Sequence, residues 1–181
     1  NLNQGLFTVM SYNNAWETGP NGDTPGSTLA NGYMGTLGAL DIALLQQKYG
    51  ANMSFNAGDT NYTLASANGA GVYYSCIWDG GGNDAINYAG SASAFIDLRA
   101  ATIDYGEGGG GYVSFVTGVF AGFTIAQGVV IENASGGSGD GTHEAIVSIA
   151  SAAAVRTGTE RGIGGEFALR LATPRPVVTA P

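Results

Sequence analysis

The sequence predicts a mainly β protein with a single helix near its N-terminus. Of its 181 residues, 31 are glycine and only 11% are charged, which suits short strands and turns better than a helical bundle. After Asn52 the chain alternates between short apolar segments and turns rich in Gly and Asp, the pattern of strands joined by tight connections. The one stretch with apolar residues at good helical spacing is residues 37–49.

Before the helix, the sequence predicts little regular structure. Leu6–Met10 is a short apolar run that suits either a buried strand or a tight turn. Residues 13–36 are expected to form a loop, because Asn, Gly, Pro, Ser and Thr dominate them and Pro20 and Pro25 interrupt regular structure.

The predicted helix has end signals on both sides. Thr36 is expected to cap its first turn through the hydroxyl, and Gly50 stands where helices commonly end. Its apolar face comprises Leu37, Leu40, Ile42, Leu44, Leu45 and Tyr49.

Seven strands are predicted after the helix, each bounded by Gly or Asp turns. They are residues 62–64, 72–78, 85–88, 94–98, 112–116, 123–125 and 129–132.

The stretch with the clearest chemistry is Trp78–Asn87. Asp79 and Asp84 flank three glycines, and glycine lets the backbone turn its carbonyls inward at little steric cost. Carboxylates and inward carbonyls are the hard oxygen ligands that Ca²⁺ selects. This segment differs at one position from the calcium-binding nonapeptide G-G-x-G-x-D-x-U-x. Asp79 stands in place of the first glycine, and Ile86 is the apolar residue U. The alternative is an acidic hairpin turn without a metal.

Composition restricts the possible partners. The net charge of −8 argues against nucleic acid and anionic membrane and fits a cation binder. Cys76 is the only cysteine, so no disulfide bond within the chain can stabilise the fold. No segment approaches the roughly 18 apolar residues of a membrane span, and Asn1–Gln4 does not begin a signal peptide. These observations favour a calcium binder without nucleic-acid or membrane partners. The chain is also expected to be a monomer.

Several segments resemble one family in the same order. Thr8–Tyr12, which reads Thr-Val-Met-Ser-Tyr, resembles the Met-turn of the serralysin group of metzincin zinc peptidases (peptidase family M10), which are secreted bacterial endopeptidases. Leu40–Asn52 is similar to the helix that leads out of the catalytic domain in that family. The segments similar to the family's C-terminal calcium-binding domain are Gly58–Tyr62, Ile77–Asp84, Ile96–Arg99 and Gly128–Gly139.

The resemblance implies a zinc endopeptidase, yet the zinc-binding histidines are missing from this sequence. Metzincins hold Zn²⁺ with three histidines of H-E-x-x-H-x-x-G-x-x-H and use its glutamate as the general base. This sequence contains only His143. In the family the motif lies upstream of the Met-turn, so the chain resembles a piece that lacks the N-terminal catalytic half. By itself it is not expected to be a protease.

Two residues of the Met-turn have roles by resemblance only. Tyr12 would ligate zinc and steady the oxyanion in the complete enzyme, and Met10 would form the apolar floor beneath the histidines. Within this chain alone we expect Met10 to be an ordinary core methionine. The alternative for Tyr12 is a tyrosine packed at a domain face.

The resemblance also implies one calcium site with three carboxylates far apart in sequence, Asp79, Asp84 and Glu132. Asn56 departs from the arginine usual in the family, which a carbonyl ligand tolerates. Asp59 is expected to order its turn rather than to bind metal. The remaining ligands implied are Asn56, Gly58, Thr60, Gly81, Gly82 and Val130.

Other polar residues are expected to have ordinary structural roles. Asp97 and Asp104 are interpreted as surface carboxylates, Cys76 as a small buried side chain, and His143 as a solvated one. Gly136–Gly141 should begin β-roll repeats, but its sixth position is glycine rather than aspartate and no second repeat follows. A calcium site there is expected to be weak or empty.

Together these observations predict a β-sandwich that leads into a truncated parallel β-roll. The expected division is residues 1–51 as the end of a metzincin catalytic domain, 52–141 as a calcium-binding domain, and 142–181 as an atypical, partly disordered tail. The leading functional hypothesis is a fragment of a secreted calcium-dependent zinc metalloendopeptidase, exported without a leader by a type I route. The complete enzyme would carry zinc and act on proteins. The alternatives are a stand-alone calcium-binding module and a metal-free, glycine-rich β adhesin.

Overall fold

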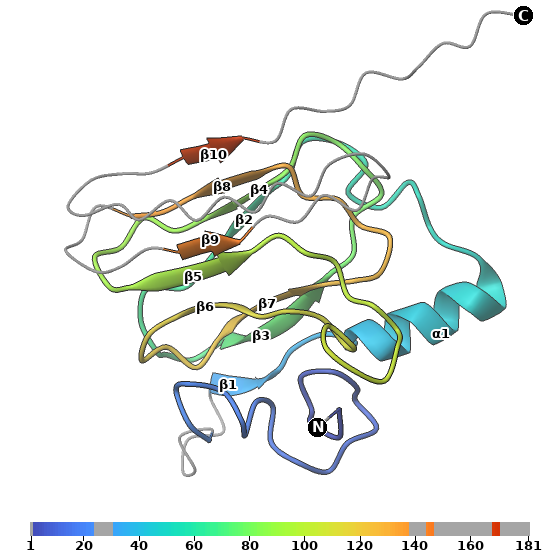
Figure 1. Ribbon diagram of the computed structural model, residues 1–181, viewed down its shortest axis with the longest axis horizontal. Coiled ribbons are helices and arrows are strands. Elements are labelled where there is room, and N and C mark those ends of the chain that lie inside the picture. Colours follow the sequence, from blue (N-terminus) through green and yellow to red (C-terminus); the bar gives the residue numbers. More distant parts are fainter. Residues whose placement is uncertain (1, 24–30, 138–143, 147–167, 171–181) are drawn as a thin grey trace, which may run out of the picture.

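The computed structural model describes residues 2–23, 31–137, 144–146 and 168–170. Within these ranges the chain forms ten strands and one helix, which confirms the mainly β prediction (Figure 1). The elements are β1 (Asn31–Met34), α1 (Ala39–Tyr49), β2 (Asn61–Thr63), β3 (Val72–Ile77), β4 (Ala85–Asn87), β5 (Ala94–Asp97), β6 (Ser114–Val116), β7 (Gly122–Ile125), β8 (Asn133–Ser135), β9 (Glu144–Ile146) and β10 (Ala168–Arg170).

The strands form two sheets. The six-stranded sheet has the order β1-β3-β7-β6-β5-β9, and the four-stranded sheet has the order β10-β8-β4-β2. In the four-stranded sheet β2, β4 and β8 run parallel, whereas β10 is antiparallel to β8. Chain segments far apart in sequence therefore lie side by side as neighbouring strands (Figure 1).

The main hydrophobic core lies between the two sheets. Ile77, Ile96 and Ile125 contribute from the six-stranded sheet, and Ile86 and Ala134 contribute from the four-stranded sheet. Removing each large aliphatic side chain from water stabilises the fold by roughly 1.5–3 kcal/mol. The core therefore holds the sheets together and fixes the loops at their ends.

The N-terminal segment packs through turns rather than a strand. Leu6 and Phe7 are buried in a second apolar cluster with Tyr74 and Val113, and the Leu6 amide donates to the Ala15 carbonyl. Of the two alternatives for Leu6–Met10, the tight turn is the one observed.

The cap prediction for the helix is wrong. Helix α1 begins at Ala39, and the Asp41 carboxylate accepts a hydrogen bond from the Gly38 amide at 2.9 Å. Thr36 instead accepts a hydrogen bond from the amide of Cys76 in β3. Because Asp41 already satisfies an amide at the first turn, the helix starts after Gly38 and Thr36 ties the preceding segment to the sheet.

The apolar face of α1 is less buried than the sequence suggests. Ala39 is the buried residue of the helix, while Leu44, Leu45 and Tyr49 are exposed. With Trp78 and other side chains, the helix lines an open apolar groove. No helix in the described part of the chain is long and apolar enough to cross a membrane.

Two strand predictions need correction. Residues 129–132 are not a strand, because the Val129 amide closes a turn onto the Ala126 carbonyl and β8 begins only at Asn133. Strand β1 lies inside the predicted loop 13–36, where it pairs in parallel with β3. Its sequence, Asn-Gly-Tyr-Met, carries a weak strand signal, so pairing with β3 determines its conformation.

Candidate calcium site

The parallel register of β2, β4 and β8 aligns the three residues that directly precede these strands. Asn61 of β2 pairs with Ala85 of β4, and Ala85 pairs with Asn133 of β8. The residue before each of these positions is Thr60, Asp84 or Glu132. Because neighbouring strands lie about 4.8 Å apart, these three residues lie side by side although they are far apart in sequence.

Asp84 is at the centre of this row. It is fully buried, and its Oδ1 accepts a hydrogen bond from the Thr60 amide at 2.8 Å. Its own amide donates to Glu132 Oε2 at 2.8 Å, so Glu132 faces the Asp79–Asp84 turn, as a shared calcium site requires. Asp84 Oδ2 is buried without any hydrogen-bond partner. An orphaned carboxylate oxygen is costly in a protein interior unless a cation or donor reaches it.

The surroundings of Asp84 disfavour the negative charge on its carboxylate. Burial raises the pKa of the Asp84 carboxyl, the hydrogen bond from Thr60 lowers it, and the nearby carboxylates of Asp79, Glu132 and Asp59 raise it further. Three acidic neighbours thus act on one buried carboxylate. Such a group favours a bound cation.

Asp79 is held in a fixed orientation by two donors. Its Oδ1 accepts from the Gly81 amide at 2.9 Å, and its Oδ2 accepts from the Tyr62 hydroxyl at 2.6 Å. The Asn56 side chain in turn donates to the Tyr62 hydroxyl at 3.2 Å. Burial and the hydrogen bond to Asp79 raise the pKa of Tyr62 to about 12, so the phenol keeps its proton and donates it.

The turn between Asp79 and Asp84 depends on glycine. Gly81 and Gly82 have φ values of 129° and 150°, which L side chains rarely adopt. A Cβ at Gly82 would lie 2.7 Å from the Gly58 carbonyl oxygen and 2.9 Å from Asp84 Oδ1. Gly82, the Gly58 carbonyl and the Asp84 carboxylate therefore share one crowded space.

Hydrogen bonds join the expected site residues in two separate groups. Asp84 is bonded to Thr60 and Glu132, whereas Asp79 is bonded to Gly81 and Tyr62. Asp79, Asp84 and Glu132 are all buried, and the Thr60 hydroxyl contacts the Gly58 carbonyl at 2.9 Å. The Val130 side chain is exposed, and the ligand role of its carbonyl stays a prediction. Among the described residues, no group of three or more His, Cys, Asp or Glu side chains is placed to hold a metal ion. Backbone carbonyls would have to complete any coordination, which Ca²⁺ tolerates.

Two neighbours of the site have supporting roles. Asp59 Oδ1 accepts a hydrogen bond from the Asn83 amide at 2.9 Å, in keeping with its expected role of ordering the turn. Tyr62 lies in a segment that resembles the family, but the sequence alone assigned it no contact. The sequence signal that could identify it is its place in Gly58–Tyr62, three residues after Asp59.

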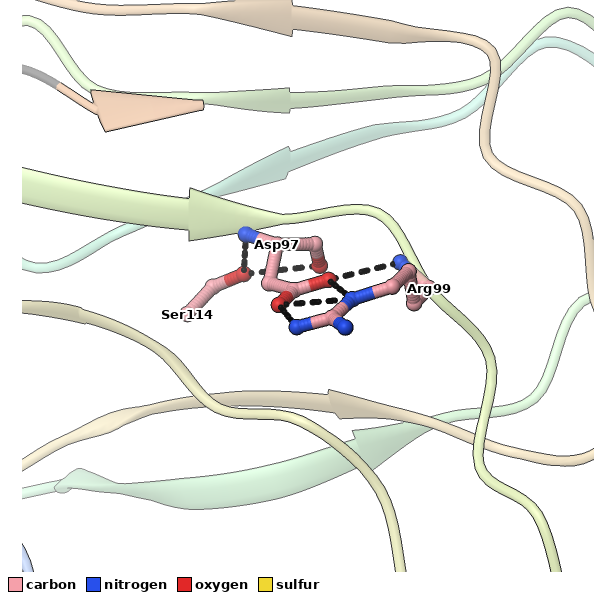
Figure 2. A network of polar contacts seen from close by, with 3 residues as sticks. All are labelled: Asp97, Arg99 and Ser114. Atoms are coloured by element: carbon pink, nitrogen blue, oxygen red, sulfur yellow. Dashed lines mark hydrogen bonds and ion pairs between the residues drawn. The ribbon is translucent and has the colours of Figure 1, made fainter. Parts of the chain in front are cut away.

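The interpretation of Asp97 as a surface carboxylate is wrong. Asp97 is only 1% exposed, and its carboxylate pairs with the Arg99 guanidinium at 2.6 Å (Figure 2). The Ser114 hydroxyl accepts from the Asp97 amide and donates to the Asp97 carbonyl. The Arg99 guanidinium also lies over the Tyr112 ring, 3.4 Å from its centroid. Asp104 is exposed, as expected.

The Met-turn residues are not packed within the described part of the chain. Met10 is 79% exposed, so the expectation of a core methionine is wrong, and Tyr12 is fully exposed rather than packed at a domain face. The turn runs over the surface, where the Thr8 hydroxyl and the Val9 amide bind Asp41 of α1. Cys76 is buried, which confirms its structural interpretation. His143 and the repeat positions 138–141 lie outside the described residues.

Comparison with known proteins gives consistent matches. Residues 46–163 match the family described as Peptidase M10 serralysin C terminal. Serralysin G of Dickeya chrysanthemi is 39% identical over 151 residues, covering 78% of this chain and 27% of that protein. Serralysin of Proteus mirabilis is 35% identical over 144 residues, covering 74% and 26%. Metalloprotease AprA of Pseudomonas entomophila (strain L48) is 34% identical over 145 residues, covering 74% and 27%. The chain thus spans about a quarter of the length of these relatives.

Proposed function

Since the chain belongs to the serralysin C-terminal family of M10 peptidases, we propose that it is the calcium-binding part of a secreted zinc metalloendopeptidase. Its own activity is to bind Ca²⁺ where the Asp79–Asp84 turn meets the starts of β2, β4 and β8. The single observation that carries this proposal is the buried, partnerless Oδ2 of Asp84 beside two further buried acids.

The donor set suits a hard cation. Asp79, Asp84 and Glu132 supply carboxylate oxygens, and Asp84 Oδ2 has no competing protein donor. Each carboxylate oxygen has two lone pairs, so the oxygens that accept a backbone amide or the Tyr62 hydroxyl can still ligate a metal. Carbonyls of Asn56, Gly58, Gly81, Gly82 and Val130, together with Thr60, would complete a shell of six to eight oxygens.

A bound Ca²⁺ would supply positive charge among carboxylates that otherwise repel one another. The residues involved come from the 56–60 loop, from the turn after β3 and from the start of β8. Holding them together links the six-stranded sheet, which contains β3, to the four-stranded sheet, which contains β4 and β8. Calcium binding would therefore stabilise the arrangement of both sheets.

Zinc chemistry and protein substrates belong to the complete protein. The one histidine of this sequence cannot form a three-histidine site, so the zinc ligands and the glutamate base would come from residues outside this sequence. Tyr12 is fully exposed and so is accessible to such a partner region, where it would have its zinc or oxyanion role. Residues 1–51 would then belong with the catalytic domain and 52–141 with the calcium domain. Leaderless type I export to the extracellular medium belongs to the same proposal.

Thermal unfolding of the chain in Ca²⁺ or chelator tests the proposal. Wild type should melt at a higher temperature in Ca²⁺, with stabilisation of about 2.7 kcal/mol at a concentration of 100 times Kd. Asp84→Asn should lose this response, whereas Asp104→Asn, which alters an exposed carboxylate, should keep it. If wild type melts identically in millimolar Ca²⁺ and in chelator, the calcium function is wrong and the metal-free adhesin becomes the better hypothesis.

A further inference from the structure

Tyr62 connects the two sheets to the proposed calcium site, and the inference drawn from it rests on the proposed function. The residue lies in β2, at the position paired with Ile86 of β4. Its ring packs edge-on against Phe123 of β7, with centroids 6.1 Å apart. Strand β7 belongs to the six-stranded sheet and β2 to the four-stranded sheet. Tyr62 is therefore held by its backbone in the four-stranded sheet and by its ring against the six-stranded sheet.

The hydroxyl of Tyr62 joins two segments that supply expected ligands. It donates to Asp79 Oδ2 at 2.6 Å and accepts from the Asn56 side-chain amide at 3.2 Å. Since Asn56 provides a donor, the single phenol proton is directed to Asp79. Asn56 has a positive φ of 50°, so its backbone conformation is one that asparagine adopts more readily than most residues.

We propose that Tyr62 is a positioning residue of the calcium site, which orients Asp79 and the Asn56 loop for the ion without being a ligand itself. The Gly81 amide fixes the other oxygen of Asp79, so the carboxylate is held from both sides. Partners of this kind orient metal ligands and preserve the affinity of the site.

Tyr62→Phe tests the proposal because it keeps the ring against Phe123 and removes only the hydroxyl. Tyr88→Phe is the matched control, since it removes the hydroxyl of a buried tyrosine that accepts a hydrogen bond from the Ala92 amide. Calcium affinity is measured by isothermal titration of the chelator-treated chain with CaCl₂, well below the melting temperature. Tyr62→Phe should raise Kd by about 10–100-fold, and Tyr88→Phe should leave Kd unchanged.

A second variant covers the case in which Tyr62→Phe does not fold. Asn56→Gly removes the amide donor, keeps the backbone carbonyl and accepts a positive φ, and Asn56 is exposed. It should raise Kd several-fold. Unchanged Kd in the folded variants overturns the positioning role and leaves the proposed function intact. Absence of calcium binding in wild type overturns both.

Discussion

Arg99 allows the negatively charged Asp97 side chain to be buried. Asp97 is almost fully buried at the end of β5, and Arg99 binds it through both guanidinium and backbone nitrogens (Figure 2). Removing one partner of a buried ion pair leaves an uncompensated charge, which costs more than removing both.

Arg99→Met should therefore destabilise the chain by about 3–5 kcal/mol, measured by urea unfolding. The double variant Asp97→Asn with Arg99→Met should recover most of this loss, because the amide oxygen can still accept from the backbone amide at position 99. A single Arg99→Met variant as stable as wild type would show that the pair is not what stabilises Asp97 in its buried position.

Cys76 should be unreactive in the folded chain. Burial raises the pKa of its thiol to about 11, so the thiolate is scarce at pH 8 and reagents cannot reach it. The unfolded thiol ionises first, near pH 8.5–9. Folding stability should consequently fall as pH rises from about 9 to 11, by roughly 2–3 kcal/mol from this residue.

Thiol labelling at pH 8 with and without urea measures the reactivity of Cys76 in the folded and unfolded chain. Chemical unfolding at several pH values from about 9 to 11 measures the loss of stability. Cys76→Ala is the control and should show a shallower alkaline loss. Rapid labelling of the native chain would contradict the buried, protonated thiol.

At the scale of elements, the turn joining β3 to β4 carries the most specific backbone requirement. Gly82→Ala would place its Cβ against the Gly58 carbonyl and force an unfavourable φ. We expect a loss of about 1–3 kcal/mol together with weaker calcium binding.

Gly69→Ala is the matched control, because a Cβ there meets nothing within 4 Å. Differential melting of both variants, each in Ca²⁺ and in chelator, makes the comparison. Equal melting temperatures for Gly82→Ala and Gly69→Ala would rule out the steric requirement at the turn.

The sequence predicts a strand correctly where its local apolar pattern agrees with its pairing in the sheet. β3, β4 and β5 follow alternating apolar segments bounded by Gly or Asp, and the sequence predicts them well. The sequence places a strand at 129–132 and misses β8, because Asn-Ala-Ser is a weak strand signal and pairing with β4 determines the position of β8. For Asp97 the sequence does contain the charge partner, because Arg99 is only two residues away. That Asp97 is buried follows from the strand packing that brings Ser114 of β6 against it, which the local pattern does not show.

For the whole molecule, the order of the parallel strands explains how distant carboxylates meet. Asp84 and Glu132 are separated by 48 positions yet share a hydrogen bond, because β4 and β8 are neighbours in register. The sequence pattern identifies the acidic residues and glycines of the candidate site. The order of the strands and the contacts of Tyr62 can be seen only in the structure. A cation bound at this point would join the ends of strands from both sheets.

A crystal structure of the chain grown in millimolar Ca²⁺ tests this arrangement most directly. The expected result is an ion 2.3–2.6 Å from Asp84 Oδ2, about the usual Ca²⁺–oxygen distance, with oxygens of Asp79 and Glu132 in the same shell. Density for the loops with no ion beside Asp84, or with Glu132 turned away from it, would contradict the account.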